Sequence, residues 1–332
     1  MMRPITKKLL ATSVAMAAVL GMTSAASAQV VVKYAHVVAP NTPKGQGAEF
    51  FKKRAEEILG DKVKVEIYPN SQLFDDDKVL PAMLRGDVQL AAPSLAKFGK
   101  WTSKLGLFDL PFLFNDMEAV ECFQKGEKGQ ELLLSMADKG LTGLGYWHNG
   151  LKQLSANKPL LTPADAAGLK FRIQSSDVLA AQFEAVDAVP QKMAFAETYS
   201  ALQTGVVDGQ ENTWSNIYSQ KFFEVQDYIT ESNHGLLDYL VVTSTKWWDG
   251  LDPEIQAGLK QAMDEATEYA NGLSGKLADE QRQLIVDSGE TELVKPSADD
   301  VKAWREAMKP VWAQFEGDIG ADLIEAAAAC NK

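Results

Sequence analysis

The 332-residue sequence is poor in the residues that most often bind metals or carry redox chemistry. It contains two cysteines and three histidines. Cys122 and Cys330 lie far apart, and His36, His148 and His234 are scattered, so none of them has metal-ligand or redox spacing. The sequence therefore predicts no metal site and no cofactor. An oxidising compartment would permit a disulfide between the two cysteines, but the sequence leaves that pairing open.

Motifs that mark common enzyme sites are also missing. The sequence has no G-x-S-x-G, no H-E-x-x-H and no P-loop, and Gly140, Gly143 and Gly145 do not match G-x-G-x-x-G. Asp208 and Glu211 could act as paired carboxylates in acid–base chemistry, although acidic residues are common here. We expect a binding protein rather than an enzyme, and turnover of a ligand would separate the two.

Positive charge is scarce as well. The chain carries 33 lysines and arginines against 45 acidic residues, which gives a formal net charge of −12. Nucleic-acid binding requires a basic face, so nucleic acid is not an expected partner. Because the net charge repels anions at long range, a site for an anionic ligand must be locally positive.

One apolar run, residues 9–22, stands out near the start. It follows the cations Arg3, Lys7 and Lys8 and precedes Ala26-Ser27-Ala28. This order is typical of a secretory signal peptide, 1–28, cleaved after Ala28. The run is shorter than the ~20 residues that a membrane span needs, and no cysteine follows it to carry a lipid anchor. We therefore expect an exported protein with a formal charge of −12 − 3 = −15.

Alternating strand and helix patterns predict a parallel sheet in the first third of the chain. Strands are expected at 30–36, 63–67 and 88–92, with a helix at 75–85. In such sheets ligands bind beyond the carboxyl ends of the strands. That rule places His36 with the following loop (Lys44), and Ser94 with the following loop (Lys97), at a candidate binding edge. For His36 and Ser94 taken alone, ordinary polarity at strand ends is the favoured explanation.

A second candidate site lies between residues 168 and 221. A strand at 169–173 carries Arg172, a helix is expected at 197–204, and a turn at Asp208-Gly209 presents Asn212. Arginine is suited to bidentate recognition of a carboxylate, and an amide nearby adds a further donor. The pattern suits a site for a small anion, but for a lone arginine on a half-buried strand a surface or salt-bridged role for Arg172 is the favoured interpretation.

The length of the chain and one long helix predict two lobes. About 300 residues exceed one typical domain. Strands at 141–147 and 235–245 are expected to connect the halves. A helix at 253–287 would be on the order of 50 Å long at 1.5 Å per residue, which is longer than one domain requires. Two shorter helices broken near Gly272 or Gly275 are the alternative.

The sequence resembles the substrate-binding proteins of TRAP transporters, the DctP family. The resemblance runs from about Val32 to the C-terminal helix. It is carried by several separate segments: KYAHVVAPNTPKG (33–45), YPNSQLF (68–74), APSLAKF (92–98), LPFLF (110–114), GLKFRIQSS (168–176) and VDGQENTW (207–214).

This resemblance implies an α/β, two-lobed periplasmic binding protein fold. Each lobe would be a β-sheet flanked by helices, with the long helix spanning both lobes. Residues 29–148 and 238–280 would form lobe I, and residues 149–237 and 281–332 would form lobe II, joined by a hinge.

The resemblance also implies roles for particular residues. The arginine of the GLKxR strand, here Arg172, pairs with the ligand carboxylate, and the asparagine of the DGxEN turn, here Asn212, lies nearby. Asn149 and Lys152 belong to the segment that lines the cleft, and Lys152 stands where a basic residue often contacts the ligand. Trp214 replaces a common proline, and it either narrows the pocket or packs against the hinge.

The function that the resemblance implies is transport. The chain would be a monomeric periplasmic receptor that delivers a C4-dicarboxylate (malate, succinate or fumarate) to a cation-coupled permease of two membrane proteins. Lys44 and Lys152 are extra cations for a second carboxylate, which favours this class over keto acids, sugar acids and sialic acid. A ligand-sensing subunit of a signalling system remains the alternative, and growth against transcription in a knockout would separate them.

Overall fold

The computed structural model describes residues 29–331. The predicted signal peptide, 1–28, lies outside these residues. Within 29–331, no helix combines the length and the apolar character that crossing a membrane would require.

Nine strands form one mixed sheet. Their order is β2-β1-β3-β8-β4-β7-β5-β6, with β9 pairing to β8. The strands are β1 Val30–Ala35, β2 Val63–Tyr68, β3 Leu90–Ala91, β4 Leu141–Ala156, β5 Lys170–Ile173, β6 Val189–Lys192, β7 Gly209–Asn212, β8 Tyr228–Ser244 and β9 Glu292–Val294. β1 pairs in parallel with β2 and β3, and β5 pairs in parallel with β6 and β7. The predicted parallel unit in the first third of the chain is therefore present.

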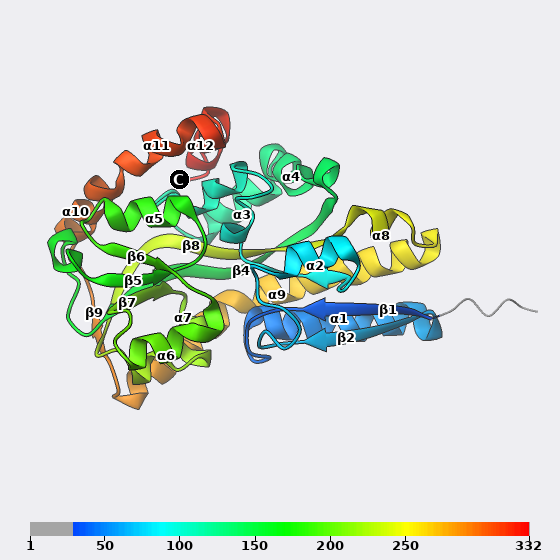
Figure 1. The fold of residues 1–332 in the computed structure, drawn as a ribbon, viewed down its shortest axis with the longest axis horizontal. Helices are drawn as coiled ribbons and strands as arrows, with labels where there is room; N and C mark the ends of the chain where they lie inside the picture. The colour runs from blue at the N-terminus through cyan, green and yellow to red at the C-terminus, as the bar shows by residue number, and fades with distance from the viewer. Residues whose placement is uncertain (1–28, 332) are drawn as a thin grey trace, which may run out of the picture.

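The two long antiparallel strands β4 and β8 join the lobes. They contain 16 and 17 residues, and their pairing runs from Leu141–Ser244 at one end to Ala156–Tyr228 at the other. Figure 1 shows them crossing from the side of β1 and β2 to the side of β5, β6 and β7. The sequence patterns at 141–147 and 235–245 thus mark only parts of these strands, and the sheets of the two lobes are continuous.

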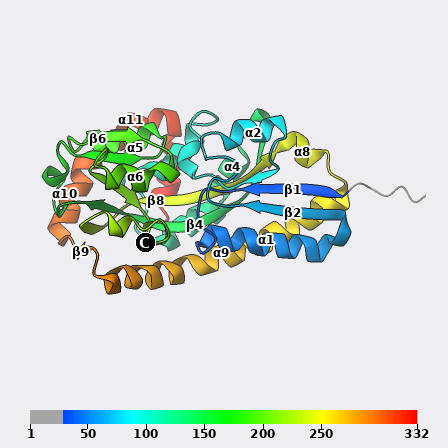
Figure 2. The ribbon, with the colours of Figure 1, turned by 60° about the horizontal axis from the view of Figure 1, so that its bottom comes forward.

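Helices cover both faces of this sheet (Figures 1 and 2). The α-helices are α1 Pro43–Leu59, α2 Val79–Arg85, α3 Met117–Lys125, α4 Glu127–Leu134, α5 Asp177–Glu184, α6 Thr198–Gln203, α7 Trp214–Ser219, α8 Thr245–Asp249, α9 Pro253–Ser288, α10 Ala298–Met308, α11 Pro310–Ile319 and α12 Ala321–Ala328. Short 3₁₀ turns are η1 Gly60–Lys62, η2 Leu95–Lys97, η3 Lys104–Asp109, η4 Ala137–Lys139, η5 Pro163–Ala166, η6 Phe195–Glu197 and η7 Phe222–Glu224.

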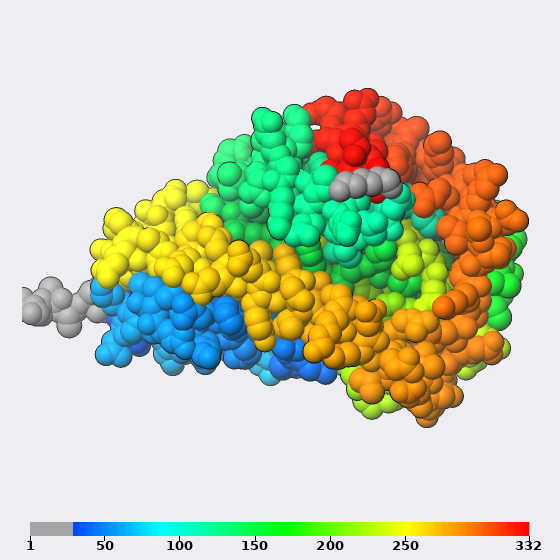
Figure 3. Space-filling view, turned by 180° about the vertical axis from the view of Figure 1, so that it is seen from behind, coloured from blue at the N-terminus to red at the C-terminus, as the bar shows by residue number. Residues whose placement is uncertain are grey.

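The predicted long helix is continuous as α9, with 36 residues. Asp252 caps its first turn and Gly289 ends it in the left-handed conformation. Gly272 and Gly275 do not break it. The helix packs against α1 beside the first lobe and α7 beside the second, and Figure 3 shows its yellow-to-orange band crossing the whole back of the molecule. α9 therefore spans both lobes.

Three local predictions differ from the structure. The helix expected from residue 75 begins at Val79, because the Asp75 carboxylate accepts hydrogen bonds from the backbone of Asp77 and Lys78 and holds a turn there. The strand expected at 88–92 shortens to Leu90–Ala91. The turn expected to present Asn212 is strand β7, since its backbone pairs with β4 and β5.

Cys122 and Cys330 form a disulfide, with their Cα atoms 5.8 Å apart. Cys122 lies in α3, and Cys330 follows α12 at the end of the chain. α12 packs on α3, whereas α11 packs on α5. The disulfide therefore fastens the C-terminal segment to a helix 208 residues earlier in the sequence.

Removing this crosslink should destabilise the protein. Without the disulfide the unfolded chain is no longer closed into a long loop and gains conformational entropy. The loss of a native disulfide typically lowers the free energy of unfolding by about 2–4 kcal/mol. The Cys122→Ala/Cys330→Ala variant should therefore have a lower urea midpoint than the oxidised wild type. Reductant should lower the midpoint of the wild type and leave that of the variant unchanged. Equal midpoints for variant and oxidised wild type would contradict this expectation.

Candidate functional site

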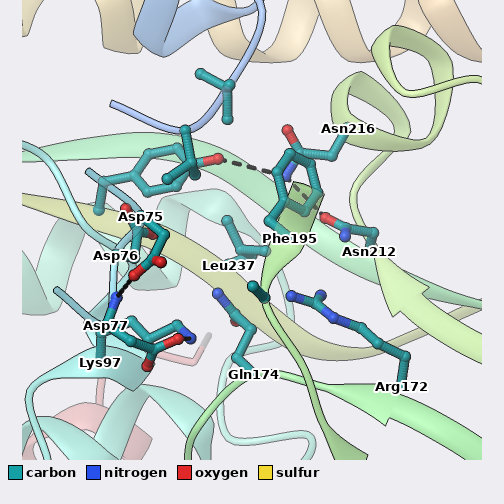
Figure 4. A pocket seen from close by; sticks show the side chains of 14 residues that line it. Asp75, Asp76, Asp77, Lys97, Arg172, Gln174, Phe195, Asn212, Asn216 and Leu237 are labelled. Atoms are coloured by element: carbon teal, nitrogen blue, oxygen red, sulfur yellow. Dashed lines mark hydrogen bonds and ion pairs between the residues drawn. The ribbon is translucent and has the colours of Figure 1, made fainter. Parts of the chain in front are cut away.

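A pocket with about 390 Å³ of empty space lies where the two lobes face each other. Segments following β1 and β3 and the turn before α2 line it from the first lobe, and β5, β7 and α7 line it from the second (Figure 4). Its lining residues are Val37, Val38, Asp75, Asp76, Asp77, Lys97, Arg172, Gln174, Ala194, Phe195, Asn212, Asn216, Leu237 and Tyr239.

Arg172 extends from β5 into this pocket (Figure 4). The residue is 2% exposed. Its Nε and Nη2 donate to the backbone oxygen of Met193 at 3.1 and 2.9 Å. No carboxylate within residues 29–331 forms an ion pair with it. Burial lowers the pKa of Arg172 to about 10, against the charges of nearby acids, so the guanidinium stays charged at neutral pH.

Two asparagines and a tyrosine form the adjoining wall. Asn212 Oδ1 accepts from Asn216 Nδ2 at 2.8 Å, and Asn216 Nδ2 also lies 3.4 Å from the hydroxyl of Tyr239. The Nδ2 group of Asn212 is buried with no acceptor among the described residues. A buried amide donor without a partner is unfavourable, so this wall is prepared to donate to an acceptor in the pocket.

The opposite wall is acidic but contains one cation. Lys97 Nζ bonds to Asp77 Oδ2 at 2.8 Å and to Ser175 Oγ at 3.3 Å. Asp76 is buried, and its Oδ2 accepts from the backbone of Ser94 at 3.3 Å. Burial raises the pKa of Asp76, although the charges of Lys44 and Lys97 oppose the rise.

Lys44, His36 and Ser94 lie behind this pocket rather than in its lining. Lys44 Nζ donates to the Ala92 oxygen at 2.8 Å and sits 3.5 Å from the centre of the Tyr239 ring. Burial lowers the pKa of Lys44 to about 8. Burial and then the charge of Lys44 lower the pKa of His36 to about 3, so this histidine is neutral. Ser94 caps η2, which carries Lys97.

Lys152 belongs to a buried ion cluster with Glu211 and His234. Lys152 Nζ lies 2.7 Å from Glu211 Oε1, and His234 Nε2 lies 2.9 Å from Glu211 Oε2. Burial acts to raise the pKa of Glu211, but Lys152 and His234 more than offset it and lower this pKa to about 2. Gly235 makes room for the cluster, because a Cβ there would lie 2.8 Å from Lys152 Cε. Lys152 therefore neutralises Glu211 within the protein.

Asn149 and Trp214 also lie outside the lining. Asn149 Nδ2 donates to Thr213 Oγ1 at 2.7 Å and to the Tyr239 hydroxyl at 2.9 Å, which supports the wall of the pocket. Trp214 packs in an apolar cluster with α9, and its ring is 5.6 Å from the Arg282 guanidinium. Of the eight candidate residues, the structure brings Arg172 and Asn212 into the pocket lining and leaves the other six outside it.

Among the remaining lining residues, Lys97 lies in the loop after Ser94 that the strand pattern places at the binding edge, whereas most of the others carry no local signal in the sequence. Gln174 lies two residues after Arg172, where alternation along an extended chain returns a side chain to the same face, and this signal could have found it. Tyr239 and Asn216 reach the pocket only because β8 pairs with β4 and α7 packs against β4. Within residues 29–331, no cluster of three His, Cys, Asp or Glu side chains could hold a metal ion.

Comparison with known proteins decides the family. The model of the bacterial extracellular solute-binding proteins, family 7 (DctP), matches residues 34–318. The C4-dicarboxylate-binding periplasmic protein DctP of Vibrio cholerae is 55% identical over 305 residues, covering 92% of each chain. The chain belongs to the DctP family. The family is one of solute-binding proteins, and the resemblance stated from the motifs is confirmed.

Solved structures of the DctP family share the fold. A TRAP periplasmic solute-binding protein from Shewanella oneidensis with bound succinate has a TM-score of 0.91 and 55% identity, and the match covers 92% of this chain and 100% of that one. One from Pseudomonas aeruginosa with bound L-malate has a TM-score of 0.84 and 49% identity, covering 86% and 99%. The predicted two-lobed α/β fold with a helix spanning both lobes is confirmed.

Breaking the buried Lys152–Glu211–His234 cluster should lower the stability of the protein. Glu211→Ala leaves Lys152 buried without its counter-ion, and breaking such a pair typically costs about 3–5 kcal/mol. The urea midpoint at pH 7 should fall accordingly. Because the pKa of Glu211 in the folded protein is below its ordinary value of 4.5, the wild-type advantage should be complete above about pH 4.5 and lost as the pH falls toward 2.

The control is a pair at the surface. Lys221 Nζ lies 2.6 Å from Glu224 Oε1, with side chains that are 65% and 32% exposed. Glu224→Ala should leave the midpoint nearly unchanged, since water screens this pair. The assignment of the buried cluster fails if Glu211→Ala is no more destabilising than Glu224→Ala.

Proposed function

We propose that this chain is the periplasmic receptor of a TRAP-type transporter and that it binds a C4-dicarboxylate such as succinate, malate or fumarate between its lobes. The names of the 55%-identical relatives support this substrate class, as do the succinate and L-malate bound in the related structures. A membrane permease would take up the acid that the receptor delivers. The word periplasmic in those names, with the leader pattern of residues 1–28, supports the location.

The observation that carries the proposal is the buried guanidinium of Arg172. A charge removed from water requires a counter-charge, and Arg172 has only the Met193 carbonyl as its hydrogen-bond acceptor within residues 29–331. A ligand carboxylate would provide the missing counter-charge through two parallel hydrogen bonds. The Nδ2 donor of Asn212 would complete that carboxylate's shell.

The remaining parts of the proposal concern how the receptor works. Lobes of residues 29–148 with 238–280, and 149–237 with 281–332, would close on the acid by bending at β4, β8 and α9. Lys44 and Asn149 would support the ligand site from behind, next to Tyr239. The receptor would act as a monomer and release the acid unchanged.

Arg172 variants test the ligand site directly. Arg172→Ala should weaken succinate binding by about two to nearly four decades, since removing one partner of a buried pair costs ~3–5 kcal/mol and each decade is ~1.4 kcal/mol. Arg172→Lys keeps the charge but loses the fork, so it should also bind much more weakly. Calorimetric titration of folded variants measures both.

Arg282→Lys is the matched control for these variants. Arg282 pairs with Glu231 and lies over the ring of Trp214, outside the pocket lining. Its replacement should leave succinate affinity within about threefold of the wild type, well under one decade. Wild-type affinity in Arg172→Lys would refute bidentate recognition, and wild-type affinity in Arg172→Ala would place the site elsewhere.

Lys44 should make succinate binding depend on pH. Its pKa in the structure is about 8, and a bound anion favours the charged ammonium, which raises this pKa in the complex. Binding should therefore take up protons near pH 8, and affinity should fall as the pH rises from 7 to 9. Titration in two buffers of different ionisation enthalpy measures the uptake. Lys44→Met should abolish it, and uptake that persists in this variant would assign the proton to another group.

A further inference from the structure

We propose that Lys97 binds the second carboxylate of the ligand. Without ligand, Lys97 forms an ion pair with Asp77, and the carboxylate of a dicarboxylic acid displaces Asp77 from it. The inference rests on the proposed function and deepens it, because it names the residue that would separate dicarboxylates from monocarboxylates. Lys97 comes from the first lobe and Arg172 from the second, and both line the same pocket. Figure 4 shows them entering it from different walls, with Gln174 between them.

Charge counting in the pocket singles out Lys97. Among the lining residues only Arg172 and Lys97 are cationic. Lys152 and Lys44 already have partners within the protein. Lys152 is paired with Glu211, and Lys44 donates to the Ala92 carbonyl and lies against the Tyr239 ring. A dianion with one carboxylate on Arg172 therefore finds its second lining cation at Lys97.

The ion pair between Asp77 and Lys97 is one in which a ligand carboxylate could displace Asp77. Its Oδ2 atom lies 2.8 Å from Lys97 Nζ, and the side chains of lysine and aspartate are 3% and 40% exposed. Burial acts to raise the pKa of Asp77, but Lys97, Ser175 and the charge of Arg172 bring it below its ordinary value. Asp77 is thus close enough to both cations to be stabilised by each. An exposed carboxylate regains water when it leaves, whereas the buried ammonium requires a substitute anion.

Lys97 also links the second carboxylate to closure of the lobes. Its Nζ lies 3.3 Å from Ser175 Oγ in the segment between β5 and α5 of the second lobe. An acid bonded to both Arg172 and Lys97 would add an ionic connection between the lobes at this point. A monocarboxylate on Arg172 would leave Lys97 with Asp77 and make no such connection.

A cycle of two ligands and two proteins tests the anchor. Succinate and succinamate have the same length, but succinamate carries an uncharged amide in place of one carboxylate. The wild type should prefer succinate by about 10- to 100-fold, the contribution of one hydrogen bond to a charged group. In Lys97→Met the preference should shrink to within about threefold, with succinamate affinity nearly unchanged. Lys192→Met, which removes a cation that is paired with Asp177 outside the lining, should keep the wild-type preference.

The sign of the Asp77→Asn effect separates an anchor from a merely structural pair. If Asp77 competes with the ligand, Asp77→Asn should strengthen succinate binding by about 3- to 10-fold, as expected for removal of a partly exposed ion-pair partner, and should leave succinamate binding unchanged. Asp75→Asn removes the same charge from the lining and keeps the turn that Asp75 caps. It should change the binding of both ligands by less than Asp77→Asn changes that of succinate.

The outcomes distinguish this inference from the function on which it rests. If the wild type binds succinate and the Lys97→Met variant keeps the wild-type preference for succinate over succinamate, the role of Lys97 is overturned and the proposed function still stands. Weaker succinate binding in both Lys97→Met and Asp77→Asn would mean that the pair is structural, which also overturns it. Wild type that binds neither acid would overturn the proposed function itself. Thermal melting of each variant confirms that the comparison is made on folded protein.

Discussion

The buried charge of Arg172 is the constraint on which the rest of the site depends. A guanidinium that is 2% exposed must keep its charge in a place where water cannot solvate it. The protein supplies a backbone carbonyl and several acids at longer range, but no direct carboxylate partner within the described residues. We propose that a ligand carboxylate supplies the counter-charge that no described residue places in contact with Arg172.

Strand β7 shows how the fold keeps two charged systems apart. Alternation along the strand sends Glu211 and Asn212 to opposite faces of the sheet. Asn212 shares the face of Arg172, because Arg172 pairs in register with Gln210 on the neighbouring strand. Glu211 instead meets Lys152 and His234 on the other face. Two consecutive residues thus contribute to the pocket wall and to the neutralised ion cluster on the other face.

The sequence was sufficient where the signal is local. The GLKxR strand, the DGxEN segment and the helical spacing from Ile255 onward each contain their own evidence, and Arg172, Asn212 and α9 lie where those patterns predict. Lys152 shows the limit. A sequence reveals that a residue is cationic, but whether its charge is free depends on the pairing of β4, β7 and β8, which brings Glu211 to it across 59 residues. The same holds for Lys44, whose partner is the Ala92 carbonyl beyond β3.

The acidic turn before α2 makes the lining of the pocket net negative, which opposes the binding of an anion. Three aspartates and two cations line the pocket, a formal sum of −3 + 2 = −1, yet the proposed ligand is a dianion. Asp75 is bonded to Lys78 and Asp77 to Lys97, so only Asp76 is buried without a cation in direct contact. Burial raises the pKa of Asp76, which makes it the acid that a dianion could most easily convert to its neutral form. Under the proposed role of Lys97, this charge pattern would disfavour a monoanion, which cannot displace Asp77, and would favour an acid that brings a second carboxylate for Lys97.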